Sequence, residues 1–82
     1  MQLVFTERFM PVIQKHRRLL GESVRAARKK AGFSQEKLAE KADLSAVFIS
    51  RIERGVESPS VDNLVKIARA LGSRVRSLVT DF

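Results

Sequence analysis

Apolar residues recur at three- and four-residue steps along most of the chain, which is the spacing of an amphipathic helix. The first series of this kind is Leu19, Leu20, Val24, Ala27 and Ala31. Gly32 follows it and supplies a stop. We therefore predict a first helix from about His16 to Ala31, or from as early as Pro11, because the fixed φ of proline suits a first helical turn. Gly21 within it costs up to about 1 kcal/mol relative to alanine, which indicates close packing of another backbone or a break.

Two short helices are predicted next, each beginning after a serine that is a suitable N-cap. Ser34 starts the second helix, which ends near Ala42, and Ser45 caps the third. The buried stripe of the second helix is Leu38, Ala39 and Ala42. The core contacts of the third come from Ile49, Ile52 and either Val47 or Phe48. Gly55 ends the third helix because glycine readily adopts the left-handed conformation.

Ser60 begins a fourth helix that Gly72 closes, after a loop around Pro59. Its apolar positions are Val61, Leu64, Val65, Ile67, Ala68 and Leu71. A short fifth helix is expected from about Arg74 to Val79. No alternating strand pattern appears beyond residues 2–5, so the fold class is all-α with five helices. We assign residues 1–15 to an N-terminal apolar extension or the start of the first helix, and residues 16–82 to the folded domain.

The charge balance of the chain points to a polyanionic partner. It has 82 residues, enough for one domain, with 16 Lys and Arg against 9 Asp and Glu and a net charge of +7. A positive protein gains affinity for nucleic acid by releasing counterions. Ribosomal and membrane-surface proteins carry similar charge, so this observation alone does not identify the partner.

Several classes of protein are disfavoured by what the sequence lacks. There is no Cys and only one His, so a disulfide framework, a thiolate nucleophile and a metal site are not expected. There is no nucleophile motif and no glycine loop that cradles phosphates, so we expect neither an enzyme nor a cofactor. No apolar run approaches the roughly 18 residues of a membrane span. We expect a cytoplasmic protein with no membrane association.

Four motifs follow one another in order at short spacings. They are G-F-S-Q-E-K-L-A at 32–39, L-S-A-V-F-I-S-R-I-E-R-G at 44–55, P-S-V-D-N-L at 59–64 and A-R-A-L-G at 68–72. Together they resemble the phage lambda repressor, Cro and XRE-type helix-turn-helix family over roughly residues 19–78. The resemblance implies that the second and third helices form the DNA reader and that the other three support it. It implies a sequence-specific transcriptional regulator, with a repressor expected.

In such a reader, the third helix lies in the major groove with its N-terminal residues on base edges. The base-reading candidates are Ser45, Ala46, Val47, Ser50 and Arg51. Arg51 can pair with guanine through two hydrogen bonds, whereas Ala46 and Val47 can only touch a thymine methyl group. Ser45 as an N-cap alone, Val47 as a core residue and Arg51 as a surface ion pair are the competing interpretations. Direct readout is expected to be sparse, so DNA shape should contribute.

Contacts to the DNA backbone are expected mainly from the start of the second helix. The resemblance implies that Gln35 grips a phosphate there, beside the free backbone N–H groups of a helix N-terminus. Arg54, Lys37 and Ser58 are further phosphate candidates. The basic residues of the first helix, Arg17 and Arg18 with the run at 28–30, either extend this footprint or form a solvated face, and we favour the solvated face for most of them.

The resemblance also implies a largely buried ion pair between Arg28 and Glu53, which would tie the first helix to the end of the third. The role of this pair would be architectural. Removal of one partner of a buried ion pair typically costs about 3 to 5 kcal/mol.

A homodimer on double-stranded DNA is expected, because two-fold dimers suit palindromic sites. One candidate interface is the apolar N-terminal segment Leu3, Val4, Phe5, Phe9, Met10, Val12 and Ile13, which folds back onto the core if it is not an interface. The other is the C-terminal group Val75, Leu78, Val79 and Phe82. No small-molecule effector is expected. The alternative function is an antitoxin-like or adaptor module whose N-terminal segment binds a partner protein.

Overall fold

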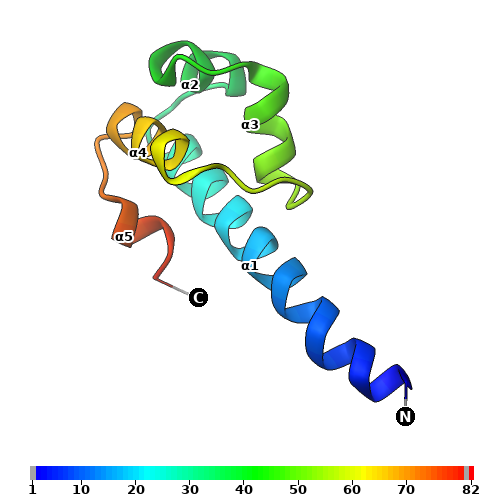
Figure 1. Ribbon diagram of the computed structural model, residues 1–82. Coiled ribbons are helices and arrows are strands. Elements are labelled where there is room, and N and C mark those ends of the chain that lie inside the picture. Colours follow the sequence, from blue (N-terminus) through cyan, green and yellow to red (C-terminus); the bar gives the residue numbers. More distant parts are fainter. Residues whose placement is uncertain (1, 81) are drawn as a thin grey trace.

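The described residues form five helices, and Figure 1 shows how these helices are arranged. The computed structural model describes the backbone of residues 2–80 and 82, and the side chains of residues 14–80 and 82. The helices are α1 (Gln2–Lys30), α2 (Gln35–Ala42), α3 (Ala46–Glu53), α4 (Val61–Ala70) and α5 (Val75–Leu78). The described residues contain no strand. The predicted all-α fold with five helices is confirmed.

Helix α1 is longer than the sequence pattern predicts. It begins at Gln2, so a start at His16 or Pro11 is wrong, and the alternating stretch at residues 2–5 is helical. The prediction placed the start near the first core-facing residues, but the hydrogen bonds of a helix are internal and continue without a packing partner. Its 29 residues, at about 1.5 Å each, account for the 46 Å long axis of the molecule. Figure 1 shows the N-terminal part of α1 projecting beyond the other helices, not folded back onto them.

The starts of the three middle helices are fixed by serine N-caps, as predicted. The Oγ atoms of Ser34, Ser45 and Ser60 accept hydrogen bonds from backbone N–H groups three residues later, at 3.0, 3.0 and 3.1 Å. Each cap satisfies a donor that the first helical turn leaves without an internal partner. The caps therefore locate the helix boundaries from local chemistry.

The turn between α2 and α3 depends on a residue that the sequence analysis did not single out. Asp43 adopts a left-handed conformation with φ of 57° and is the C-cap of α2. Aspartate tolerates this conformation better than most residues because its short polar side chain can bond locally. Only residues 43–45 separate the two helices, which makes the turn tight.

The core forms where α1, α2, α3 and α4 meet and α5 closes one end. Its fully buried large side chains are Val24, Leu38, Ile49, Ile52, Ile67 and Leu78. On α3, Phe48 packs against this core and Val47 is 64% exposed, so Phe48 is the core residue of the two candidates. Ala31 is exposed because α1 ends one residue before it.

Gly21 allows α1 to pack directly against the end of α3. A Cβ atom at Gly21 would meet the carbonyl oxygen of Ile52 and would lie 2.7 Å from that of Glu53. Such contacts leave no room for any side chain. Close packing of another backbone therefore explains this glycine, and α1 continues through it without a break.

Most of the C-terminal group that the sequence offered as a dimer interface belongs to the core. Leu78 is 2% exposed, and Val75 and Val79 pack against the buried cluster. Phe82 is 51% exposed and stacks on His16 of α1, with ring centroids 5.2 Å apart. Phe82 is therefore the most accessible member of that group. The side chains of the N-terminal segment lie outside the described residues.

Candidate nucleic-acid interface

The exposed face of α3 carries the residues predicted to read bases, in three different environments. Val47 is largely exposed, and Ser45 is exposed while its hydroxyl oxygen also caps the helix. Ala46 is half-buried and packs against the core, so only part of its surface is accessible. Ser50 is half-buried one turn further along. The accessible tip of α3 is therefore small and mostly apolar.

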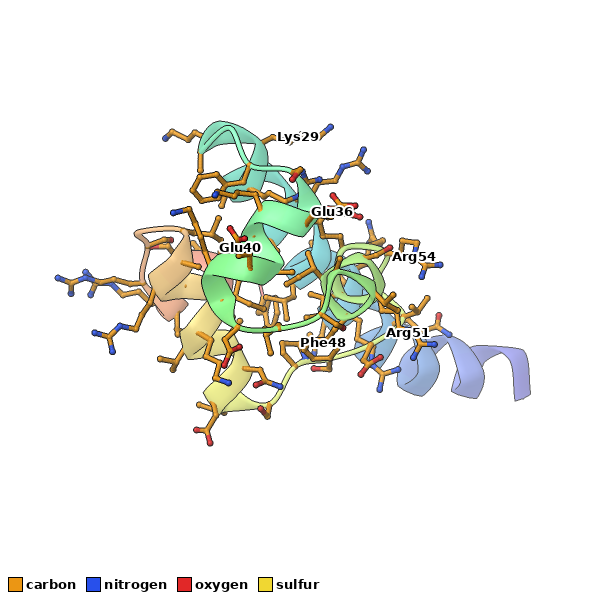
Figure 2. The ribbon with its side chains drawn as sticks, turned by 90° about the horizontal axis from the view of Figure 1, so that it is seen from above. Lys29, Glu36, Glu40, Phe48, Arg51 and Arg54 are labelled. Atoms are coloured by element: carbon orange, nitrogen blue, oxygen red, sulfur yellow. The ribbon has the colours of Figure 1, made fainter. Side chains whose placement is uncertain are left out.

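Arg51 lies on α3 one turn beyond Val47, and its side chain is 56% exposed. Its Nη1 lies 3.4 Å from Oε1 of Glu57, which follows α3 in the loop to α4. A guanidinium group carries five N–H donors, and this contact uses one nitrogen. In Figure 2, Arg51 and Arg54 project from α3 on the side away from Glu40 of α2. Glu57 therefore contacts one nitrogen of the Arg51 guanidinium group, and the other N–H donors of Arg51 are available to a ligand.

Gln35 occupies the first position of α2 and has a partner that the sequence analysis did not predict. Its Nε2 donates to Oε1 of Glu53 at 3.0 Å, in a partly buried contact. A side-chain amide has two N–H donors, so this bond leaves one. The bond fixes the amide beside the backbone N–H groups at the start of α2, where an anion is favoured.

The other phosphate candidates lie on the surface around the reader. Lys37 forms an exposed ion pair with Glu40 at 3.1 Å, within α2. Arg54 is the C-cap of α3, and Ser58 is in the loop to α4; both are exposed. These residues come from α2, the C-cap of α3 and the following loop.

Arg28 and Glu53 form a buried ion pair between α1 and α3, with side chains 10% and 2% exposed. Arg28 Nε donates to Glu53 Oε2 at 2.6 Å, and Nη2 donates to Oε1 at 3.0 Å. Nη1 donates to the backbone oxygen of Phe33 at 2.8 Å, which also ties down the turn before α2. The hydrogen bond to Glu53 raises the pKa of Arg28 above its ordinary value, although burial opposes the shift. No buried side-chain polar atom in the described part of the chain lacks a partner.

Two contacts of this region had no signal in the sequence. Phe33 accepts a hydrogen bond through its backbone oxygen, and every residue type has such an oxygen, so the sequence does not indicate this contact. Glu57 follows the end of α3, so its contact with Arg51 cannot be predicted from helical spacing. Across residues 14–80 no group of three His, Asp or Glu side chains is arranged to hold a metal ion. No helix among the described residues combines the length and apolar character that a membrane crossing requires.

Comparisons with known proteins agree with this geometry. The helix-turn-helix family matches residues 24–78. Control protein C.BamHI of Bacillus amyloliquefaciens is 47% identical over 64 residues, which cover 77% of this chain and 79% of that protein. The immunity repressor protein of Bacillus phage phi105 is 40% identical over 60 residues, or 73% of this chain and 42% of the repressor.

Solved structures show the same fold. The restriction-modification controller protein C.AhdI of Aeromonas hydrophila is 34% identical with a TM-score of 0.74, and the match covers 76% of this chain and 94% of that one. The clp gene regulator ClgR of Corynebacterium glutamicum is 31% identical with a TM-score of 0.75, over 78% of this chain and 68% of that one. The match to residues 24–78 and these relatives place the chain in the XRE and lambda-repressor-like helix-turn-helix family of DNA-binding transcriptional regulators, which are not enzymes.

Proposed function

We propose that this regulator acts as a repressor that binds a palindromic operator in double-stranded DNA as a homodimer. The observation that carries the proposal is the exposed tip of α3, where Val47 is 64% exposed beside Ser45 although Ile49 and Ile52 of the same helix are fully buried. An apolar side chain left in water at the start of a recognition helix is suited to contact with a thymine methyl group.

Base recognition is divided among the exposed residues of α3. Arg51 pairs with a guanine through its free N–H donors, and Val47 with the accessible part of Ala46 contacts thymine methyl groups. The hydroxyl groups of Ser45 and Ser50 discriminate weakly between bases. Because few hydrogen bonds read the sequence directly, DNA shape and the pairing of two half-sites supply much of the selectivity.

Phosphate contacts come from Gln35, Lys37, Arg54 and Ser58. The bond from Gln35 to Glu53 supports this role, because it orders the amide before DNA arrives and so lowers the entropy cost of the contact. If a dimer contacts about 6 to 8 phosphates, the log–log slope of affinity against salt is about −5 to −7. Binding that hardly changes with salt would contradict this proposal.

The N-terminal part of α1 is our candidate for the dimer contact. Residues 2–13 of α1 leave the body of the domain as a helix, and seven of them are Leu, Val, Phe, Met or Ile. A helix this apolar is rarely left in water by a small protein. Sedimentation of the full chain at tens of micromolar should show a dimer, and Phe9→Glu should shift it toward monomer. A monomeric wild-type chain that also fails to pair on DNA would refute the dimer.

The regulated genes are proposed to include those of a restriction-modification system. Support comes from the relatives, since C.AhdI is a restriction-modification controller and C.BamHI is a control protein. Transcription from promoters of neighbouring restriction and modification genes, with and without this protein, tests the proposal. Unchanged transcription would contradict it.

Selection of binding sites from random duplexes tests the central proposal. We expect enrichment of a palindrome with half-site centres about one helical turn, roughly 34 Å, apart. The double variant Gln35→Ala, Arg51→Ala should lose the selected site. The matched control is Arg69→Ala, which removes one exposed charge from α4, as Arg51→Ala removes one from α3. Failure of the wild-type chain to enrich any sequence would refute sequence-specific binding and favour a protein-interaction module.

A further inference from the structure

An open hollow of about 630 Å³ lies between α1 and the end of α3, next to the proposed DNA-reading surface. Its lining residues are Gln14, Arg17, Arg18, Arg54, Gly55 and Val56. The first three are spaced at i, i+3 and i+4 on α1, so they share one face of that helix. The other three belong to the C-terminal end of α3 and the chain that follows it. Residues far apart in the sequence thus bring three guanidinium groups to one concave surface.

The two sides of the hollow are held together by direct backbone packing. Gly55 has a φ of 74°, and a Cβ atom added to it would lie 3.1 Å from the Cα of Arg18. The backbone N–H groups of Gly55 and Val56 donate to Ile52 and Arg51 at 3.0 and 3.1 Å. This closed turn fixes the floor of the hollow, and the arginine side chains are the groups left to meet a ligand.

The charge of the hollow is strongly positive. Glu22 lies 3.7 Å from Arg18, but both side chains are more than 60% exposed, so this i, i+4 pair neutralises little. Arg51, the neighbouring cation on α3, does not line the hollow, and one nitrogen of its guanidinium group lies 3.4 Å from Glu57. Three like charges around one hollow repel one another in the free protein. An anion with several oxygens would remove that repulsion and could accept from more than one guanidinium group.

We propose that this hollow holds a phosphate group of the DNA backbone, with Arg17 and Arg18 of α1 acting together with Arg54. The inference rests on the proposed function and extends it, because the DNA footprint then includes α1 and not only α2, α3 and the loop after them. Phosphate fits the chemistry, since arginine forks match its oxygens through paired hydrogen bonds. Such a contact sets the position and affinity of the protein without reading sequence.

The test compares two charge-matched variants on the selected operator and on a random duplex. Arg17→Gln, Arg18→Gln removes two charges from the hollow, and Lys66→Gln, Arg69→Gln removes two exposed charges of α4 that do not line it. We expect the hollow variant to flatten the log–log salt slope by about 1 for each phosphate lost, which is about 2 for a dimer with one phosphate in each of its two hollows. Affinity for both duplexes should fall by the same factor. The control variant should keep the wild-type slope, and thermal melts should show both variants folded.

Equal slopes for the two variants would overturn the inference while leaving the proposed function intact, provided that the wild-type chain binds its operator. A wild-type chain that binds no operator would instead refute the proposed function. A second measurement examines the hollow without DNA, by following the amide signals of Gly55 and Val56 during titration with sodium phosphate against sodium chloride of equal ionic strength. We expect saturable shifts with phosphate that the hollow variant lacks. Such shifts combined with equal salt slopes would mean that the hollow takes free phosphate, which also overturns the inference.

Discussion

The substitution Arg28→Ala should strongly destabilise this protein. Arg28 donates two hydrogen bonds to Glu53, at 2.6 and 3.0 Å, and one to the backbone oxygen of Phe33 at 2.8 Å. The substitution removes all three. It leaves the carboxylate of Glu53, which is 2% exposed, with the amide of Gln35 as its remaining hydrogen-bond partner.

The expected loss is a large fraction of the total stability. Breaking a buried ion pair by removing one partner costs about 3 to 5 kcal/mol. At roughly 0.05 to 0.15 kcal/mol per residue, a chain of 82 residues has about 4 to 12 kcal/mol in total. A domain of this size loses about 4 to 8 °C in Tm for each kcal/mol. We therefore expect Tm to fall by about 12 °C or more, or the variant to be unfolded at 25 °C.

A second variant distinguishes the free-energy cost of leaving Glu53 without its charged partner from the net stabilisation that the ion pair provides. Arg28→Met combined with Glu53→Leu removes both charges and keeps apolar volume at each position. Apolar replacements of buried ion pairs are often neutral or stabilising. We expect the double variant to be much more stable than Arg28→Ala, and within about 2 kcal/mol of the wild type.

Circular dichroism melts and urea titrations of the full chain measure both variants. Arg25→Ala is the matched control, because Arg25 lies one turn earlier on α1 and is exposed. Exposed substitutions of this kind change stability by about 0.5 kcal/mol or less. If Arg28→Ala melts within about 3 °C of the wild type, the pair is not buried in solution and the reasoning is wrong.

Three further outcomes follow from the same contacts. Gly21→Ala should lower the free energy of unfolding by about 1 to 3 kcal/mol or more in urea titrations, because a Cβ atom has no room against the end of α3. A loss equal to that of Glu22→Ala, at the exposed next position, would contradict the close packing. Arg51→Ala should weaken operator binding by about 1 to 3 kcal/mol in fluorescence anisotropy without changing Tm, and equal weakening by Arg69→Ala on α4 would show that only net charge matters. Because the pKa of Arg28 is raised above the ordinary arginine value, its contribution to stability is complete below that ordinary value and is lost only as pH rises through the still higher folded-state pKa. A drop in Tm between pH 7 and 10 that Arg28→Met, Glu53→Leu abolishes would contradict this.

Local chemistry explains why most of the fold could be predicted. The starts of α2, α3 and α4 depend on serine side chains that accept from N–H groups three residues later, and such caps are visible in the sequence. The start of α1 was predicted wrongly because the apolar periodicity marks where a helix meets the core, whereas the helix itself extends to Gln2. Caps and glycines therefore predicted boundaries well, and periodicity predicted buried faces.

Side-chain contacts between residues far apart in the sequence were harder to predict from the sequence. The family resemblance suggested Arg28 with Glu53, but the bond from Gln35 to Glu53 and the contact of Arg51 with Glu57 depend on how helix ends meet. The same holds for Arg17 and Arg18, for which the sequence left open an extension of the DNA footprint or a solvated face. Their place beside Arg54 follows from the packing of Gly55 on α1.

The sequence alone was enough to predict the five helices and the excess of basic residues, because these depend on composition and on short-range spacing, and its family resemblance supplied the proposed residues of the reader. Which charged side chains form pairs, which are buried and which line a common surface depends on how the helices pack. The hydrogen bonds of Arg28 with Glu53 join residues 25 positions apart, and the residues that line the hollow lie still further apart in the sequence. No local pattern encodes a separation of that kind. The hollow at the end of α3 is the clearest case, since its three arginines become one surface only when the two helices pack.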